Sequence, residues 1–217
     1  MSRHLPFPLL DLPEELASCN GWTQEVYRDL LAYQSGRISR AELDAKYLHR
    51  RAILTLDLTG FTARCLDGGQ AQALLRILDA QRICVPVLRD CGADPIRAFA
   101  DDLVALFEDP GRALDAAFEM HRRVALYAEQ GLAGDDPVQC CIGIGYGDVY
   151  AIGPNLAMGD EMNRASKLGE DLARGGETLV TGGVVAALCQ RRDVGFAPGP
   201  RHDNLFPYFV ASRSPAA

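Results

Sequence analysis

The sequence predicts an α/β fold, a sandwich in which helices cover a mixed β-sheet. Strand-like and helix-like segments alternate from residue 51 onwards, as expected for layered α/β proteins. Strand pairs joined by short turns are interspersed among them, which argues against a doubly wound parallel sheet. The chain of 217 residues, with 48% apolar and 24% charged side chains, suits one globular domain with a short extension.

Residues 1–48 form this extension, for which we expect helices. Its apolar residues follow helical spacing, and Ser39 and Glu42 stand at the spacing of a capping box. We interpret the extension as a packing or dimerisation arm. The main domain then spans residues 49–217.

The first elements of the main domain alternate between strand and helix. Residues 51–58 are apolar and predict a buried strand. Residues 68–92 predict a helix that is disturbed at Pro86 and ends at Gly92. Residues 94–109 predict two strands around a tight turn.

The second half continues in the same way. A helix over 109–131 begins after Asp109, which we expect to cap it, with Pro110 at its first position. Residues 137–153 predict two strands joined near Tyr146–Asp148. The later segments predict a helix over 159–176, a strand over 177–181, a short helix over 182–190 and one or two strands over 194–212.

Composition limits the partners. The net charge of −7 argues against a broad surface for nucleic acid or for an anionic membrane, but it allows a small phosphate-binding pocket. Seven scattered cysteines without a C-x-x-C pair indicate reduced thiols, as in a cytoplasmic protein. The first residues lack the pattern of a signal peptide, and no apolar run is long enough to cross a membrane.

Carboxylates at strand ends are the first chemical candidates. Asp57 interrupts the apolar strand, and Asp101 and Asp102 stand at the edge of another. Because side chains alternate along a strand, only one of the adjacent pair should share the face of Asp57. Two facing carboxylates repel each other unless they are protonated or bridged by cations, so the pattern indicates either a divalent-metal site or ordinary surface carboxylates.

A turn and a helix add polar groups. Gly60 allows a tight turn after Asp57, where successive backbone N–H groups can cradle phosphate oxygens. Asn163 and Lys167 are four residues apart and share one helical face. They suit contacts to a sugar and to a developing negative charge, although a solvated helix face gives the same pattern.

Four motifs in order carry a resemblance: "DLTGFT", "RAFADDLVALF", "GIGYG" and "GDEMNRASK". Over roughly residues 50–212 the chain resembles the catalytic domain of class III nucleotidyl cyclases. The resemblance implies a mixed, mainly antiparallel sheet flanked by helices. It also implies a nucleoside triphosphate substrate, two divalent metal ions (Mn²⁺ or Mg²⁺), and a homodimer with composite active sites.

The resemblance also implies roles for particular residues. Asp57, Asp101 and the backbone carbonyl of Leu58 would bind metal, with Asp101 favoured over Asp102 by its distance from the strand's end. Asn163 would orient the ribose, and Lys167 stands where the family usually has an arginine that stabilises the transition state. The residues expected near the triphosphate are Phe61, Thr62 and, by a looser alignment, Arg201 or His202.

Base selection is where the chain departs from the family. Arg97 stands in place of the base-reading lysine, and Leu156, next to Asn155, takes the partner position. Arginine only donates hydrogen bonds, so it favours uracil O4 or guanine O6 over the amino groups of adenine or cytosine. Phe99 and a shortened segment before Asn163 would reduce the pocket towards a pyrimidine.

The chain therefore resembles the pyrimidine cyclases of Pycsar anti-phage systems, and we expect a uridylate cyclase. It would convert UTP to 3′,5′-cyclic UMP, which activates a separate effector protein. Cytidylate, guanylate and adenylate cyclases remain alternatives within the same fold. A degenerate domain that binds nucleotide without turning it over is a further alternative, because Lys167 replaces arginine and Ala100 replaces glycine.

Overall fold

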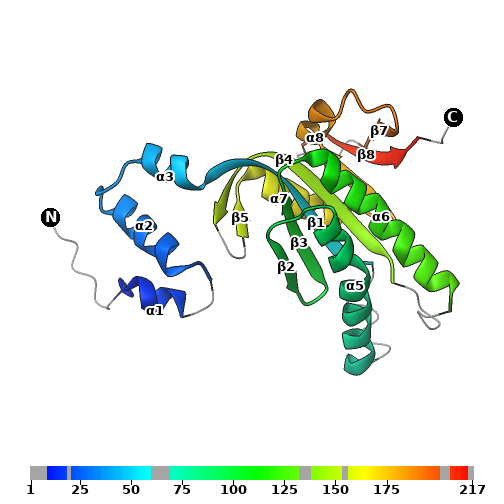
Figure 1. Ribbon diagram of the computed structural model, residues 1–217, viewed down its shortest axis with the longest axis horizontal. Coiled ribbons are helices and arrows are strands. Elements are labelled where there is room, and N and C mark those ends of the chain that lie inside the picture. Colours follow the sequence, from blue (N-terminus) through cyan, green and yellow to red (C-terminus); the bar gives the residue numbers. More distant parts are fainter. Residues whose placement is uncertain are drawn as a thin grey trace.

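The structure, a computed structural model, describes residues 9–18, 21–59, 69–131, 138–152, 156–200 and 206–214 (Figure 1). Its strands are β1 (Leu48–Leu58), β2 (Ile96–Phe99), β3 (Asp102–Phe107), β4 (Cys140–Ile152), β5 (Leu156–Met158), β6 (Thr178–Thr181), β7 (Val194–Pro198) and β8 (Tyr208–Arg213). Its helices are α1 (Pro13–Ala17), α2 (Gln24–Gln34), α3 (Arg40–Tyr47), α5 (Gln70–Asp90), α6 (Pro110–Glu129), α7 (Asp160–Ser166), the π-helical η1 (Lys167–Leu172) and α8 (Gly182–Ala187).

The strands form one sheet in the order β2-β3-β1-β4-β6-β8-β7, and β5 pairs with β4. The β4–β6 pair is parallel and the other pairs of this sheet are antiparallel. The predicted mixed, mainly antiparallel sheet flanked by helices is therefore confirmed. The 94–109 hairpin is confirmed as β2 and β3.

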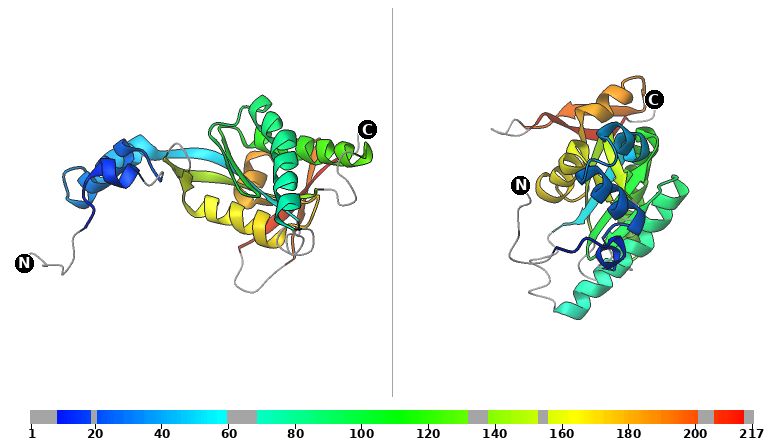
Figure 2. Two further views of the ribbon diagram at one scale, coloured as in Figure 1. Left: turned by 90° about the horizontal axis from the view of Figure 1, so that it is seen from below. Right: turned by 90° about the vertical axis from the view of Figure 1, so that its left-hand side faces the viewer.

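Both faces of the central strand β1 are buried, which explains its continuous apolar sequence. Leu54 and Leu56 pack in the larger core, together with Leu114 of α6. Ile53 points to the other face and packs with Ala165 of α7. Figure 2 shows α5 and α6 on one side of the sheet and α7 on the other.

The long helices begin and end as expected. Asp109 caps α6 by accepting a 2.8 Å hydrogen bond from the Gly111 amide. Helix α5 continues through Pro86 and ends before Gly92, which has the positive φ (+80°) that glycine adopts without steric cost. Among the described helices, none has both the length and the apolar character that a membrane crossing would require.

Residues 140–152 differ from expectation, because they form the single strand β4 instead of two strands joined near Tyr146–Asp148. Strand β4 pairs with β1 without interruption from Cys140 to Tyr150. Its glycines serve close packing and not a turn. A Cβ atom on Gly143 would lie 2.1 Å from the carbonyl oxygen of Ala165 in α7, so α7 can rest on β4 only where side chains are absent.

The N-terminal helices lie beyond one end of the sheet, where β1 and β4 project (Figure 1). A small core joins them to β4, with Val26, Leu43 and Tyr47 packed against Ile152. The expected capping box is present: the Ser39 hydroxyl accepts from the Glu42 amide, and the Glu42 carboxylate accepts from the Ser39 amide. The extension is therefore a folded helical unit attached to the end of β4.

Candidate active site

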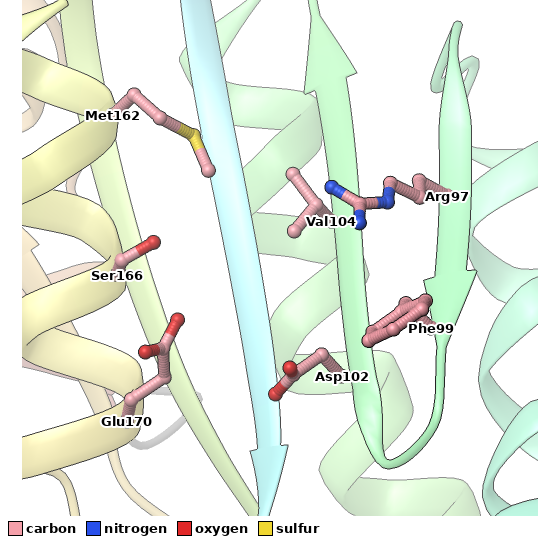
Figure 3. Close-up of a pocket in the computed structure, with 7 residues that line it drawn as sticks. All are labelled: Arg97, Phe99, Asp102, Val104, Met162, Ser166 and Glu170. Atoms are coloured by element: carbon pink, nitrogen blue, oxygen red, sulfur yellow. The ribbon is translucent and has the colours of Figure 1, made fainter. Parts of the chain in front are cut away.

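A cavity of about 190 Å³ lies over β1, between the β2–β3 hairpin and the α7–η1 segment (Figure 3). Its lining comprises Arg97, Phe99, Asp102, Val104, Met162, Ser166 and Glu170. The first four come from the hairpin and the last three from α7 and η1, on the opposite side of β1 (Figure 3).

Strand register brings Asp57 to the same face as the hairpin residue Asp102. Leu56 of β1 is paired with Leu103 of β3, so the next positions along this register are Asp57 and Asp102. Residues opposite each other in an antiparallel pair point to the same face. Asp102 therefore faces the cavity, while Asp101 lies in the turn between β2 and β3.

Asp57 lies in an electrostatic setting that opposes its ionisation. Burial is the largest cause that raises the pKa of Asp57, and a hydrogen bond from the Leu58 backbone opposes it. The charges of Asp101, Asp102 and Glu170 also raise it, in that order of size, and together these causes bring the pKa to about 6. Asp101 therefore acts on Asp57 more strongly than Asp102 does, although Asp102 lines the cavity.

The neighbouring carboxyls are disfavoured as anions too. The pKa of Asp102 is raised by burial and by the charge of Asp101, against the opposing charge of Arg97. The pKa of Glu170 is raised by burial and by nearby carboxylates, against a hydrogen bond from Ser166. The cavity therefore holds an excess of negative charge that a proton or a cation would relieve.

The donors in this cavity fit a hard divalent cation, because carboxylate oxygens are the ligands that Mg²⁺ and Mn²⁺ prefer. Within the described ranges, no three histidine, cysteine or acidic side chains are already arranged as a metal site. A cation on Asp57 and its neighbours would therefore take the rest of its coordination from water, backbone or substrate oxygens, as Mg²⁺ commonly does.

Arg97 and Phe99 occupy the hairpin side of the cavity. Arg97 is paired with Val104 and Phe99 with Asp102, so alternation along β2 puts both side chains on the cavity face. The Arg97 guanidinium carbon lies 5.3 Å from the centre of the Phe99 ring, and Phe99 is 64% exposed. The hairpin thus offers a cation and an exposed aromatic ring beside the carboxylates.

Asn163 and Lys167 are exposed and are not part of this cavity's lining. Asn163 lies on α7 and Lys167 at the start of η1, and each directly follows a residue that lines the cavity, Met162 and Ser166. Lys167 forms an ion pair with Asp171 of the same segment. One chain therefore brings together the carboxylates with Arg97 and Phe99, but not with Asn163 or Lys167.

Sequence reasoning did not identify the α7–η1 side of the cavity. Met162, Ser166 and Glu170 recur every four residues, which is a signal for one helical face. The sequence therefore shows that these three residues share one helical face, but only the fold shows that this face lines the cavity. Glu170 lies on a π-helical turn, a local feature often found at functional sites and not encoded in a simple pattern.

Some predicted residues lie outside the described part of the chain, namely Phe61, Thr62, Asn155, Arg201 and His202. Leu156 is the first residue of β5, opposite Ile152 of β4. Leu58 is the last residue of β1 and is paired with Cys140. These placements leave the predicted triphosphate contacts as predictions.

The architecture is the class III fold of adenylyl and guanylyl cyclase catalytic domains. The adenylate/guanylate cyclase/hydrolase from Silicibacter pomeroyi is 24% identical, with a TM-score of 0.65 over 78% of this chain and 98% of that one. The guanylyl cyclase Cya2 is 21% identical, with a TM-score of 0.60 over 76% and 90% of the two chains. The adenylyl cyclase CyaB from P. aeruginosa is 16% identical, with a TM-score of 0.64 over 78% and 96%.

These likenesses concern the fold. No model of a protein family matches the chain. No curated protein matches it either.

Proposed function

We propose that the protein is a nucleotidyl cyclase that converts UTP to 3′,5′-cyclic UMP and pyrophosphate. The observation that carries the proposal is the cavity lined by Asp102 and Glu170, with Asp57 on the same face of the sheet, in a chain with a cyclase fold. In the reaction, the ribose 3′-oxygen forms a bond to the α-phosphorus. The bond from that phosphorus to the bridging oxygen of the β-phosphate breaks, and the 3′-hydroxyl proton is released.

The charge of the cavity requires that substrate arrive with cations, because a triphosphate is itself strongly negative. Asp57, Asp101 and the Leu58 carbonyl would hold two divalent ions, which supply positive charge to the reacting oxygen and phosphoryl groups. Phe61 and Thr62 would contact the triphosphate. Residues 49–217 would carry this chemistry, and residues 1–48 would be the extension.

Arg97 supports a base with acceptor atoms. Its guanidinium has donors only, and it lies on the cavity face beside the Phe99 ring. Uracil O4 satisfies those donors, and the Leu156 position, next to Asn155, offers no carboxylate to an amino group. UTP is thus favoured, with GTP, CTP and ATP as the competing substrates.

Two chains would complete each site. Asn163 and Lys167 are exposed one residue away from the cavity lining, so they are accessible to a substrate held by a second copy. In this homodimer Asn163 would orient the ribose and Lys167 would stabilise the transition state after leaving Asp171. The cyclic nucleotide would then act on a separate effector protein in the bacterial cytoplasm, as in Pycsar anti-phage defence.

A product assay tests the proposal. Purified protein is incubated with each of the four ribonucleoside triphosphates and Mn²⁺ or Mg²⁺, and the cyclic products are identified by mass. We expect cyclic UMP to dominate, and Asp57→Asn protein serves as the matched control. Cyclic GMP, CMP or AMP as the main product would overturn the uridylate assignment while retaining the cyclase.

A nucleotide-binding domain without turnover is the second candidate. The ion pair between Lys167 and Asp171 favours it, because Asp171 neutralises the charge that the transition state would need. Calorimetric titration with the same four nucleotides distinguishes the two. Tight binding of nucleotide with no cyclic product from any of them would support the binding domain.

A further inference from the structure

We infer that Glu161 is a positioning residue: it locks α7 onto β4 and so sets where Asn163 and Lys167 lie. The inference rests on the proposed function for its kinetic consequence, but the lock itself is a structural claim. It also explains two glycines of β4, Gly145 and Gly147, which have no part in the proposed chemistry.

The Glu161 carboxylate joins three elements. One oxygen, Oε2, accepts from the backbone amide of Tyr146 in β4 (3.0 Å) and from the hydroxyl of Thr181 in β6 (2.6 Å). The other oxygen, Oε1, accepts from Arg164 at 2.8 Å. The side chain is only 12% exposed, so these charge-assisted hydrogen bonds are shielded from water.

The Glu161 carboxylate takes the place of a strand carbonyl as hydrogen-bond acceptor at this point of the sheet. The β4–β6 pairing ends at Ile144 and Val180. Two residues later, the Tyr146 amide is met by the Glu161 carboxylate instead of a strand carbonyl. A buried amide that loses its acceptor is costly, so the carboxylate fixes the start of α7 at the end of the β4–β6 ladder.

The glycines of β4 make room for this contact. A Cβ atom on Gly145 would lie 2.5 Å from the Glu161 carbonyl oxygen, and one on Gly147 would lie 2.7 Å from the Glu161 Cγ atom. The added Cβ atom at Gly145 would meet backbone atoms of Glu161, whereas at Gly147 it would meet only side-chain atoms of Glu161. A substitution at Gly147 therefore tests the Glu161 side chain alone.

A second anchor lies one helical turn further on. The Thr55 hydroxyl of β1 donates to the Ala165 carbonyl at 2.8 Å. Glu161 and Ala165 are four residues apart and hold the same face of α7 against the sheet. Asn163 lies between the two anchors, so a shift of α7 would displace it directly.

The first test is a double-mutant cycle that needs no activity. Gly147→Ala should lower the thermal midpoint by about 5 °C, because its new Cβ atom overlaps Glu161. In a Glu161→Ala background, Gly147→Ala should lower the thermal midpoint little further, because the overlapping Glu161 Cγ atom is gone. Equal losses in both backgrounds would overturn the claim that Gly147 serves Glu161.

The second test reads the position of α7. In Glu161→Ala protein, the Tyr146 amide and the Thr181 hydroxyl both lose their acceptor, so we expect faster amide hydrogen exchange in residues 160–166 than in the wild type. The matched control is Glu119→Ala, which removes an arginine-paired carboxylate on α6, remote from α7. Unchanged exchange in α7 would overturn the lock.

The third test is kinetic. Because Asn163 and Lys167 are assigned to the transition state, Glu161→Ala should lower kcat about 10- to 100-fold with little change in KM. Glu119→Ala should match the wild type. An unchanged kcat would overturn the positioning role. A wild-type protein without product would overturn the proposed function, while hydrogen exchange would still decide whether the lock exists.

Discussion

At the scale of residues, the adjacent pair Asp101 and Asp102 shows how strand geometry divides the work of two carboxylates. Alternation indicates that only one of them shares the face of Asp57, and the register gives Asp102 that place. The turn residue Asp101 nevertheless raises the pKa of Asp57 more than Asp102 does. Asp101 therefore stays our predicted metal ligand, while Asp102 lines the cavity next to it.

The aspartates can be separated by three isosteric variants. We expect Asp57→Asn and Asp101→Asn to lose turnover by at least about 1,000-fold, because the phosphoryl charge would be left without its metal. Asp102→Asn should retain more activity than Asp101→Asn. Titration with Mn²⁺ supplies the binding comparison, and the reverse ranking of these two variants would assign the ligand role to Asp102.

Ala100 carries local backbone strain that can be measured. It has φ of +51°, in the left-handed region that glycine adopts far more easily. Relief of about 1–2 kcal/mol against a glycine entropy cost of about 0.5–1 kcal/mol predicts that Ala100→Gly stabilises the protein by about 0.5–1 kcal/mol. Denaturant unfolding measures this difference.

The control for that variant is Ala98→Gly on the neighbouring strand β2, where φ is not positive. We expect it to lower the free energy of unfolding by about 0.5–1 kcal/mol. The same sign for both variants would contradict strain at Ala100.

At the scale of elements, the helices and strands owe their positions to contacts that differ in sequence range. The cap of α6 is local, because Asp109 and Gly111 are two residues apart. The contact of α6 with β6 is not local: His121 Nε2 lies 3.0 Å from the Thr178 hydroxyl. Short-range patterns therefore predict where α6 begins, but they do not predict that His121 contacts Thr178.

His121 should make stability depend on pH. Burial lowers the pKa of His121 to about 4, against a hydrogen bond to the Glu177 backbone that raises it. The unfolded chain then binds a proton more readily between pH 6.5 and 4, so the free energy of unfolding falls as the pH falls through this window.

A His121→Gln variant isolates this contribution, because glutamine can bond to Thr178 but does not titrate. We expect wild-type protein to lose on the order of 2 kcal/mol more than the variant between pH 7 and pH 4. Urea unfolding across that range measures it. Parallel pH profiles for the two proteins would contradict a buried neutral histidine.

At the scale of the whole molecule, the separation of functional groups over the surface is the feature to explain. Asp102 and Glu170 share one cavity with Arg97 and Phe99, whereas Asn163 and Lys167 are exposed beside it. A homodimer in which each site takes groups from both chains would join them.

Complementation between inactive variants tests this arrangement. Asp57→Asn and Asn163→Ala should each be inactive alone, but a co-expressed equal mixture should recover about a quarter of wild-type activity. Half of the dimers would then be mixed, and each mixed dimer would hold one intact site. Restoration should be absent from a mixture of Asp57→Asn and Asp101→Asn, which remove groups from the same half-site.

The sequence by itself determined the order and type of most elements, because caps, turns and hydrophobic periodicity are local signals. Asp109, Gly92 and the capping box at Ser39 are examples, and the strand containing Asp57 is another. It also marked Arg97 and Phe99, which alternate onto one face of β2. The prediction of a join near Tyr146–Asp148, in the segment that holds Gly143, Gly145 and Gly147, was wrong, because no local rule separates a turn from clearance for a distant helix.

Only the tertiary structure decided what those glycines do and which groups meet at the cavity. Glu161 meets Tyr146 and Thr181 because the β4–β6 pairing stops short of them, and this depends on the lengths of two strands distant in sequence. The π-helical turn likewise brings Glu170 towards Asp102. Such meetings arise from long-range packing, in which each position depends on elements that no short stretch of sequence contains.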